Sequence, residues 1–295
     1  MMMAEITVMD FNAKERPQWC PGCGNFGIMT ALRSALAELG IPPHMSVISS
    51  GIGCSSKMPH YVRTYGFEGL HGRSLPVASG IKLANHKLNV IAEGGDGDGY
   101  GIGMGHFQHI MRRNYDLTYI VHNNQLYALT TGQASPTTQL GVKTKTTPYG
   151  VVETPFNPIA SAILGGATFV SRAFAGDTTH LKEILKQAMK HRGFALVDVM
   201  QPCVTFNKLN TYEFFTKRCY KLEEQMPKHD IGDRSVALEK AFEPEKTNYE
   251  KIPIGVFYKT ERATYEDTLP QIKDKALVEY DVSDVDISGA YEDMI

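Results

Sequence analysis

The sequence contains the glycine-rich stretch Gly95-Asp96-Gly97-Asp98-Gly99 and, further on, the stretch Asn123-Asn124-Gln125. A segment of helical pattern and an apolar run lie between them. Each stretch directly follows an apolar run that predicts a strand, residues 88–92 for the first and residues 117–121 for the second. Polar residues that follow neighbouring parallel strands meet at the carboxyl edge of a sheet, where such sheets bind their ligands. We therefore expect the two stretches to form one site.

The residue types in these stretches suit a diphosphate and a divalent cation. Asp96 offers a carboxylate oxygen, Asn124 an amide oxygen and Leu126 a backbone carbonyl, and Mg²⁺ prefers oxygens of this kind. The three glycines of the first stretch would let the backbone approach phosphate oxygens, and we expect them to take positive φ. A helix that follows them would direct free N–H groups at an anion. The pattern predicts a metal–diphosphate site, which narrows the ligand to a nucleotide or thiamine diphosphate.

A surface turn, a dinucleotide site and a phosphate loop are weaker interpretations of the glycine-rich stretch. An Asp-Gly pair alone is a common surface turn, but this one lies between two strand patterns. No Gly-x-Gly-x-x-Gly opens a helix with an acidic residue further on, which argues against a Rossmann dinucleotide site. The sequence contains no Gly-Lys-Ser/Thr phosphate loop. The metal–diphosphate interpretation therefore remains the better one.

The alternation of apolar patterns predicts the fold class. Strands that alternate with helices favour an α/β fold, in which a parallel sheet has helices on both faces. The expected helices cover residues 24–39, 101–114 and 181–189, and the expected strands cover residues 46–49, 88–92, 117–121, 167–171 and 194–200. We predict a binding domain over residues 1–224, ending in one helix over 211–224. Residues 225–295 are polar and weakly periodic, which predicts an irregular C-terminal tail that wraps a partner or covers the site.

Composition excludes several classes of protein. The 295 residues are 42% hydrophobic, which is enough for a large core, and the net charge of −2 gives no reason to expect nucleic acid. No apolar run approaches the roughly 20 residues of a membrane span. Met1 to Asp10 lack the basic start and apolar core of a secretion signal. We therefore expect a cytoplasmic protein that contacts neither membrane nor nucleic acid.

The five cysteines are too few for a disulfide framework, and four of them stand in distinctive surroundings. Cys20 and Cys23 form a Cys-x-x-Cys, Cys54 lies in Gly-Ile-Gly-Cys-Ser-Ser, and Cys203 lies in Gln-Pro-Cys-Val. A thioredoxin-like redox pair, a structural zinc site and a [4Fe–4S] cluster all remain open on these residues alone. Cys219, in a helical pattern beside aromatic residues, is interpreted as a buried or partly buried thiol.

Taken together, these features resemble the β subunits of 2-oxoacid:ferredoxin oxidoreductases, most closely the 2-oxoglutarate type. The resemblance runs from residue 19 to residue 224 and includes WCPGCG (19–24), GIGCSSKMPHY (51–61), HGRSLPVASGIKLAN (71–85), the glycine stretch (95–103), NNQLYALTTGQASPTT (123–138) and QPCV (201–204). The tail after about residue 225 lies outside it. The resemblance implies a thiamine-diphosphate-binding fold.

The resemblance also implies three groups of site residues. Magnesium would be held by Asp96, Asn124 and the Leu126 carbonyl. Thiamine diphosphate would be lined by Ile52, Gly53, Cys54, Ser55, His71, Gly97, Asp98, Ala128 and Leu129, with His71 near its phosphate end. A single [4Fe–4S] cluster would be held by Cys20, Cys23, Cys54 and Cys203, since the chain has no Cys-x-x-Cys-x-x-Cys run.

The implied reaction is the oxidative decarboxylation of 2-oxoglutarate with coenzyme A, giving succinyl-CoA, carbon dioxide and electrons for ferredoxin or flavodoxin. Lys57 is a candidate partner of the distal carboxylate of 2-oxoglutarate, and Leu129 is a candidate for shaping the substrate pocket. We interpret the chain as too short for both thiamine half-sites, so no catalytic residue is assigned to it. The glutamate that activates the cofactor is expected from an α subunit, in an (αβ)₂ assembly.

Three alternatives stay open at this point. The substrate could be pyruvate or another 2-oxoacid. The chain could be a non-catalytic iron–sulfur subunit that only transfers electrons, with a vestigial thiamine site. It could also be a thiamine-dependent decarboxylase that is stabilised by zinc and uses no ferredoxin.

Overall fold

The computed structural model describes residues 5–227 and 230–294. Residues 1–4 belong to the segment expected to lack a secretion signal, and 228–229 and 295 to the expected tail. They lie outside the described residues. In the described part of the chain, no helix is long and apolar enough to cross a membrane.

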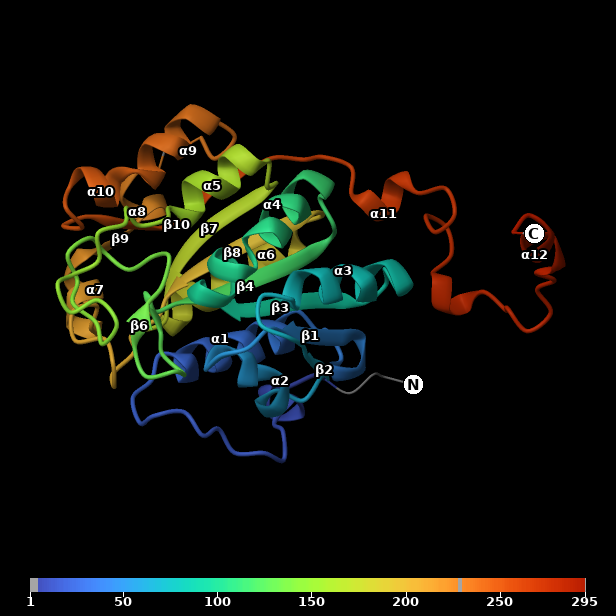
Figure 1. The fold of residues 1–295 in the computed structure, drawn as a ribbon, viewed down its shortest axis with the longest axis horizontal. Coiled ribbons are helices and arrows are strands. Elements are labelled where there is room, and N and C mark those ends of the chain that lie inside the picture. The colour runs from blue at the N-terminus through green and yellow to red at the C-terminus, as the bar shows by residue number, and fades with distance from the viewer. Residues whose placement is uncertain (1–4, 228–229, 295) are drawn as a thin grey trace.

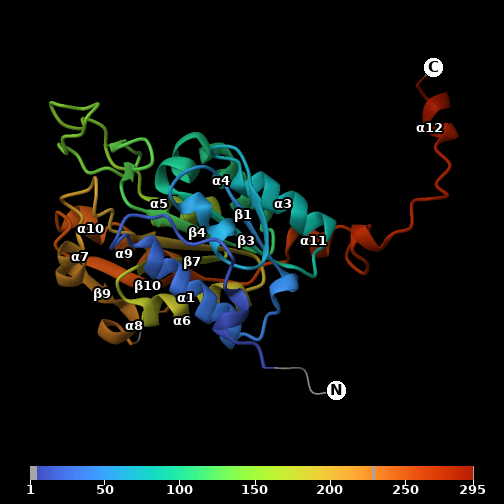
Figure 2. The same cartoon turned by 90° about the horizontal axis from the view of Figure 1, so that it is seen from below.

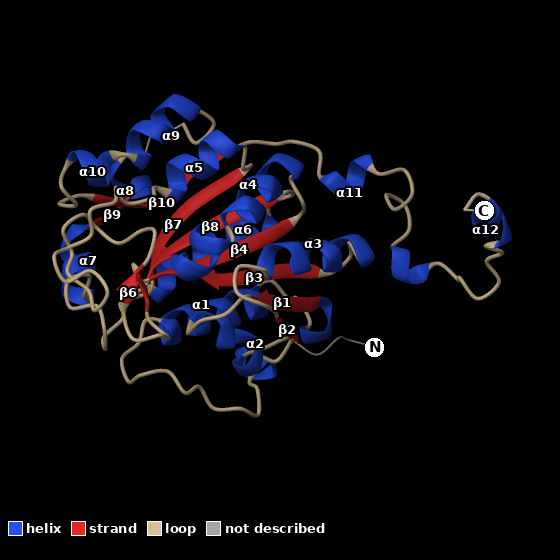
Figure 3. Cartoon of the chain, viewed as in Figure 1, coloured by secondary structure: helices blue, strands red, loops and turns tan. Residues whose placement is uncertain are grey.

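The strands of the described residues form an eight-stranded sheet with helices on both faces (Figures 1 and 3). Its order is β2 (Tyr65–Glu68), β1 (Ser46–Ser50), β3 (Asn89–Gly95), β4 (Leu117–Asn123), β8 (Phe194–Met200), β7 (Phe169–Phe174), β10 (Ile252–Lys259) and β9 (Cys219–Lys221). Within the described residues, β10 pairs antiparallel with β7 and the other strand pairs of this sheet are parallel. The predicted α/β fold is confirmed.

The register of the central strands determines where the site lies. Gly95 of β3 pairs with His122 of β4, and Asn123 of β4 pairs with Met200 of β8. The next residue of each strand, Asp96, Asn124 or Gln201, therefore emerges at the same carboxyl edge. Both faces of β4 are buried throughout, as expected for a central parallel strand.

Two layers of helices cover the sheet, as Figure 2 shows from the side. On one face lie α1 (Asn25–Glu38) and α6 (Thr178–Lys190), whose buried residues join the strands in one apolar core. On the other face lie α3 (Ser74–Ala84), α4 (Met104–Arg113) and α5 (Pro158–Gly165), which form a second core. The sheet is thus shielded from water on both sides.

The segment from 211 to 224 is not one helix, so that prediction is wrong. It contains α7 (Tyr212–Arg218), strand β9 and α8 (Leu222–Gln225) in succession. Cys219 pairs with Ile252 of β10, which takes the chain out of its helical path. Tertiary pairing here overrides a helical apolar pattern.

The region after residue 225 is less irregular than its sequence suggests. It forms α9 (Arg234–Ala241), α10 (Glu243–Lys246) and β10, whose Ile252, Ile254 and Phe257 are buried. The expectation of an irregular tail holds only beyond β10, where short helices α11 (Tyr265–Thr268) and α12 (Ser288–Glu292) are joined by loops. Figure 1 shows the last part projecting far from the body.

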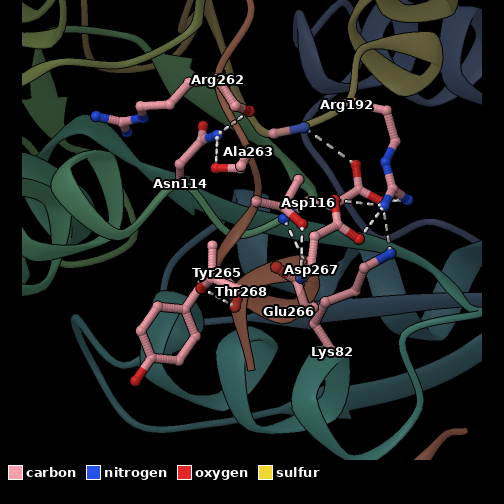
Figure 4. A network of polar contacts seen from close by, with 12 residues as sticks. Lys82, Asn114, Asp116, Arg192, Arg262, Ala263, Tyr265, Glu266, Asp267 and Thr268 are labelled. Atoms are coloured by element: carbon pink, nitrogen blue, oxygen red, sulfur yellow. Dashed lines mark hydrogen bonds and ion pairs between the residues drawn. The ribbon is translucent and has the colours of Figure 1, made fainter. Parts of the chain in front are cut away.

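Helix α11 is fastened to the edge of the sheet opposite the predicted site (Figure 4). Arg192 Nη2 lies 2.7 Å from Asp267 Oδ1, and the Asp116 backbone N–H donates to Glu266 Oε1 at 3.0 Å. Asp116 also pairs with buried Lys82 at 2.9 Å. Asp116 directly precedes β4, so these contacts lie at the amino ends of the strands and do not cover the carboxyl edge.

The smaller elements complete the chain. They are β5 (Leu126–Tyr127) paired with β6 (Gln133–Ala134), helix α2 (Met58–Tyr61), a π-helical turn at Asp98–Ile102 and single helical turns at Val8–Phe11, Pro43–Met45, Ser55–Lys57 and Leu277–Glu279.

Candidate functional site

Asp96 follows β3 as a buried carboxylate with only one oxygen satisfied. Its Oδ2 accepts hydrogen bonds from the hydroxyls of Ser135 and Thr137, the second at 2.6 Å. Its Oδ1 is buried and has no hydrogen-bond partner among the described residues. Burial raises the pKa of Asp96 to about 6, because an uncompensated charge is costly away from water. A cation at Oδ1 would remove that cost.

The second stretch forms a tight turn beyond β4. Gln125 has a φ of 60°, and Asn124 Oδ1 accepts a hydrogen bond from the Leu126 backbone N–H at 3.0 Å. An amide oxygen has two lone pairs, so this bond leaves Asn124 Oδ1 able to bind a cation as well. The turn brings the expected metal ligands of the two stretches to one edge of the sheet.

Gly97 and Gly99 of the first stretch are required for space, whereas a Cβ at Gly95 would make only ordinary van der Waals contacts. The prediction of positive φ is wrong: Gly97 has a φ of −67°, and Gly95 and Gly99 are not among the residues with positive φ. A Cβ at Gly97 would overlap the ring of Tyr127, whose hydroxyl donates to the Gly97 carbonyl at 3.1 Å. A Cβ at Gly99 would overlap the Tyr119 hydroxyl. The chain continues into a π-helical turn, a feature often found at functional sites.

Asp98 connects three loops around the site. Its Oδ1 accepts hydrogen bonds from the backbone N–H groups of Ile52 at 2.9 Å and Gly72 at 2.8 Å, and lies 2.9 Å from His71 Nδ1. Burial raises the pKa of Asp98, and these donors and His71 act in the opposite direction. The loop after β1 and the loop before α3 are thereby held against the turn after β3.

A cavity of about 170 Å³ opens between these loops. All the residues that the resemblance assigned to thiamine diphosphate line it: Ile52, Gly53, Cys54, Ser55, His71, Gly97, Asp98, Ala128 and Leu129. Gly95, Asn124, Leu126, Tyr127 and Thr130 complete the wall. We call it the cofactor cavity; that it binds the cofactor stays a prediction.

A second cavity of about 180 Å³ adjoins the first and gathers the four distinctive cysteines. Cys20, Cys23, Cys54 and Cys203 all line it, although they come from three separate loops. Cys54, Asn124, Ala128 and Leu129 line both cavities. We call the second one the cysteine cavity.

The donor set of the cysteine cavity is four thiol sulfurs, a set that either a [4Fe–4S] cluster or a structural zinc ion takes. Within the described residues, no three His, Cys, Asp or Glu side chains are gathered closely enough to hold one ion. Mononuclear zinc needs four ligands around one atom, whereas a [4Fe–4S] cluster takes a single thiolate at each iron. Burial raises the pKa of the Cys23 thiol to about 12 and also raises the pKa of Cys54, so thiolates there need a positive centre.

The two candidate substrate residues lie at the cavities, and the remaining cysteine lies away from them. Lys57 lines the cysteine cavity, and Leu129, which is 48% exposed, lies on the wall that both cavities share. Cys219 lies away from both cavities in strand β9, and burial raises the pKa of its thiol to about 12. It is therefore the partly buried thiol that the sequence indicates.

Several residues of the site are missed by sequence reasoning. Ser135 and Thr137 fix Asp96, Tyr127 packs on Gly97, and Gln201 donates a hydrogen bond to Cys23 Sγ at 3.3 Å. Hydroxyl and amide side chains are common in loops, so their residue type alone gives little signal. The position of Gln201 directly after an apolar strand could have identified it.

Two family models match the chain. "Thiamine pyrophosphate enzyme, C-terminal TPP binding domain" covers residues 51–199, which include the glycine-rich stretch 95–99, the stretch 123–125 and every residue that lines the cofactor cavity. A model of the C-terminal part of the pyruvate ferredoxin oxidoreductase beta subunit covers residues 203–274 and so extends past the point where the resemblance by motif ended.

Individual relatives agree with these models. The chain is 51% identical over 264 residues to 2-oxoacid:ferredoxin oxidoreductase subunit beta of Saccharolobus solfataricus, covering 86% of this chain and 85% of that one. It is 46% identical over 198 residues to 2-oxoglutarate oxidoreductase subunit KorB of Mycobacterium tuberculosis, covering 67% and 53%.

A solved structure extends the likeness to three dimensions. It is a 2-oxoglutarate:ferredoxin oxidoreductase from Magnetococcus marinus with 2-oxoglutarate, coenzyme A and succinyl-CoA bound, and it matches with a TM-score of 0.89 at 39% identity over 99% of this chain and 97% of the other. From the identity, the coverage and the two family models, we conclude that the chain belongs to the β subunits of the 2-oxoacid:ferredoxin oxidoreductases, and that its likeness is to the 2-oxoglutarate type.

Proposed function

We propose that this chain is the β subunit of a 2-oxoglutarate:ferredoxin oxidoreductase. The reaction converts 2-oxoglutarate and coenzyme A into succinyl-CoA and carbon dioxide, and two electrons pass one at a time through a [4Fe–4S] cluster to ferredoxin or flavodoxin. The observation that carries the proposal is the contact of two cavities, one bearing the diphosphate signature and one bearing four cysteines, through a shared wall that includes Cys54.

The cofactor cavity fits thiamine diphosphate with magnesium. The free Oδ1 of Asp96, the amide oxygen of Asn124 and the Leu126 carbonyl would hold the ion. Gly97 lines the cavity, and its lack of a side chain makes room for the Tyr127 ring beside it. His71 lines the cavity and would face the phosphate end. Thiamine diphosphate, when bound, supplies the carbon nucleophile for decarboxylation, while the chain orients it and excludes water.

The cysteine cavity fits the cluster, whose ligands would be Cys20, Cys23, Cys54 and Cys203. Because Cys54 lines both cavities, a cluster bound through Cys54 would lie next to the cofactor cavity and could accept electrons from the cofactor. All five cysteines are free thiols, which suits a reducing compartment, and we propose that the enzyme works in the cytoplasm.

Lys57 supports 2-oxoglutarate as the substrate. Among the described residues, no carboxylate lies within ion-pair distance of its ammonium group, although it lines the cysteine cavity next to the wall shared with the cofactor cavity. A free cation there would pair with the distal carboxylate, which pyruvate lacks. Leu129 would shape the same pocket. The Magnetococcus marinus relative, which has 2-oxoglutarate bound, favours this substrate over the other 2-oxoacids.

A partner chain is part of the proposal. The activating glutamate of thiamine chemistry would come from an α subunit, in an (αβ)₂ assembly, and the projecting C-terminal segment would wrap that assembly. The purified β chain alone should therefore show no turnover, whereas the co-purified complex should be active. Turnover by the isolated chain would contradict the shared active site.

The decisive experiment is anaerobic purification of the complex, followed by assay of iron, sulfide and thiamine diphosphate and by addition of 2-oxoglutarate with coenzyme A. We expect the visible absorption of the cluster to bleach on addition of substrate. A cluster without thiamine diphosphate or magnesium would favour the electron-transfer subunit instead. Zinc without visible absorption would favour the zinc-stabilised decarboxylase.

The substrate is tested by Lys57→Met, which keeps the length of the side chain and removes its charge. We expect kcat/KM for 2-oxoglutarate to fall about 10-fold or more, since a charge-assisted hydrogen bond contributes roughly 1.5–3 kcal/mol. The value for pyruvate should change much less. An equal fall for both substrates would mean that Lys57 serves the cluster or cofactor and does not select the substrate.

A further inference from the structure

We infer that the side-chain amide of Gln201 donates a hydrogen bond to the Cys23 thiolate and raises the reduction potential of the cluster. The inference rests on the proposed cluster. Gln201 would not bind the cluster directly and would act on its reduction potential through Cys23. Gln201 is 1% exposed, and its Nε2 lies 3.3 Å from Cys23 Sγ. Both groups line the cysteine cavity.

The orientation of the amide follows from its second contact. Nε2 also donates to the Pro202 backbone carbonyl at 2.8 Å. If the amide were flipped, Oε1 would face both this carbonyl and the sulfur, and three acceptors would meet without a proton between them. The N–H group therefore points at Cys23.

The position of Gln201 is fixed by backbone and packing. Its backbone N–H donates to the Asn123 carbonyl at 3.0 Å, and the Gly24 N–H donates to the Pro202 carbonyl at 3.1 Å. A Cβ at Gly24 would lie 2.9 Å from Gln201 Cγ, so a side chain there would displace the amide. These backbone hydrogen bonds and this close packing hold the Gln201 amide beside Cys23.

The consequence for the cluster is electrostatic. Reduction adds one negative charge that spreads onto the cysteine sulfurs, so a donor aimed at a sulfur stabilises the reduced form more than the oxidised form. Cys23 is 8% exposed, and a hydrogen bond in such low-dielectric surroundings is stronger than one in water. Removing the donor should make reduction harder without removing a ligand.

The test compares two identical substitutions in the same cavity. Gln201→Met removes the donor and keeps the length, and Gln18→Met is the control, because Gln18 lines the cavity with its side chain exposed. Each variant is purified with its partner subunit, and the cluster is titrated by EPR in a redox cell. We expect a more negative midpoint potential in Gln201→Met and no change in Gln18→Met. Equal potentials in the wild type and Gln201→Met would overturn the inference.

Two further outcomes are separable from these. If Gln201→Met fails to assemble its cluster, Gln18→Met protein labelled with ¹⁵N in the glutamine side-chain amides decides by electron–nuclear double resonance, because it keeps Gln201 as the glutamine that lines the cavity. A ¹⁵N coupling to the reduced cluster supports the inference, and its absence overturns it. If the wild type holds no iron or sulfide, the proposed function itself fails, and the inference fails with it.

Discussion

Thr137 carries no charge and does not line the cofactor cavity, yet it holds in place the Asp96 carboxylate, which we propose as a magnesium ligand. Its hydroxyl lies 2.6 Å from Asp96 Oδ2, which leaves Oδ1 free. Outer-shell partners of this kind commonly contribute about 10–100-fold to metal affinity. We predict a loss of that size in magnesium affinity for Thr137→Val, measured by titrating the magnesium dependence of thiamine diphosphate binding. Thr30→Val, at an exposed position on α1, is the control, and equal affinities in the two variants would contradict the prediction.

His191 gives the protein a specific sensitivity to acid. Burial lowers the pKa of His191 to about 4, and its Nε2 lies 2.8 Å from the Thr168 hydroxyl. In the unfolded chain its pKa is about 6.5, so between these values the unfolded state binds a proton that the folded state does not. Stability is therefore lost as pH falls from about 6.5 to about 4 and is unaffected by this group above that window.

The corresponding experiment replaces His191 with Gln, which cannot titrate. We expect the difference in unfolding free energy between pH 7 and pH 4 to shrink by about 2–3 kcal/mol, measured by urea denaturation. His109→Gln, at an exposed position on α4, should leave the difference unchanged. A pH dependence in His191→Gln equal to that of the wild type would refute the assignment.

Among the elements, the strands of the central sheet are those that the sequence predicts best. Strands β3, β4 and β8 are continuous apolar runs bounded by polar stretches, and each begins or ends close to its expected limits. The sequence does not predict strand β10, because Pro253 and Gly255 interrupt its alternation of apolar and polar residues and are typical of loops. Its place in the sheet depends on pairing with β7, which is distant in sequence, so no local pattern reveals it.

Strand β10 should therefore be essential to folding, although it lies in the region expected to be an irregular tail. Phe257 is fully buried in the core between the sheet and helices α4 and α5. We predict that Phe257→Ala costs about 3–5 kcal/mol of unfolding free energy, as is typical of a large core truncation. Phe242→Ala, at a position that is 41% exposed, should cost much less in the same urea titration. Similar costs for both would show that β10 is not an integral part of the domain.

At the scale of the whole molecule, the residues of the site were easier to predict than their contacts. Cys54, Cys203, Asp96 and Asn124 come together because they follow strands of one parallel sheet, and this rule is visible in the sequence. Cys20 and Cys23 lie in the loop before α1, where no strand of the described residues precedes them, so their place beside the other two depends on how that loop packs. The hydrogen bonds from Ser135 and Thr137 to Asp96, and from Gln201 to Cys23, depend on side-chain packing between loops. Such contacts involve neutral side chains at long sequence separation, which no spacing rule predicts.

We propose that the C-terminal arm, residues 280–294, contacts a partner chain and contributes little to the stability of the fold. It contains five acidic residues and no Lys or Arg, and its apolar side chains are exposed: Tyr280, Val282, Val285, Ile287, Tyr291 and Met294. We predict that truncation after Glu279 leaves the unfolding free energy of this chain unchanged and weakens its association with the α subunit. Analytical ultracentrifugation of the co-purified chains, with full-length β chain as the control, measures this. An undiminished complex would mean that the arm serves another purpose.

The exposed side chains of that arm also bear on how the cell must make this protein. Exposed apolar side chains promote aggregation. A subunit synthesised in excess of its partner would expose these side chains to other proteins. Balanced synthesis of the two subunits, or rapid clearance of orphans, would then be a condition for a soluble pool. For the laboratory, the same feature recommends co-expression from one transcript and a purification tag placed away from the C-terminus.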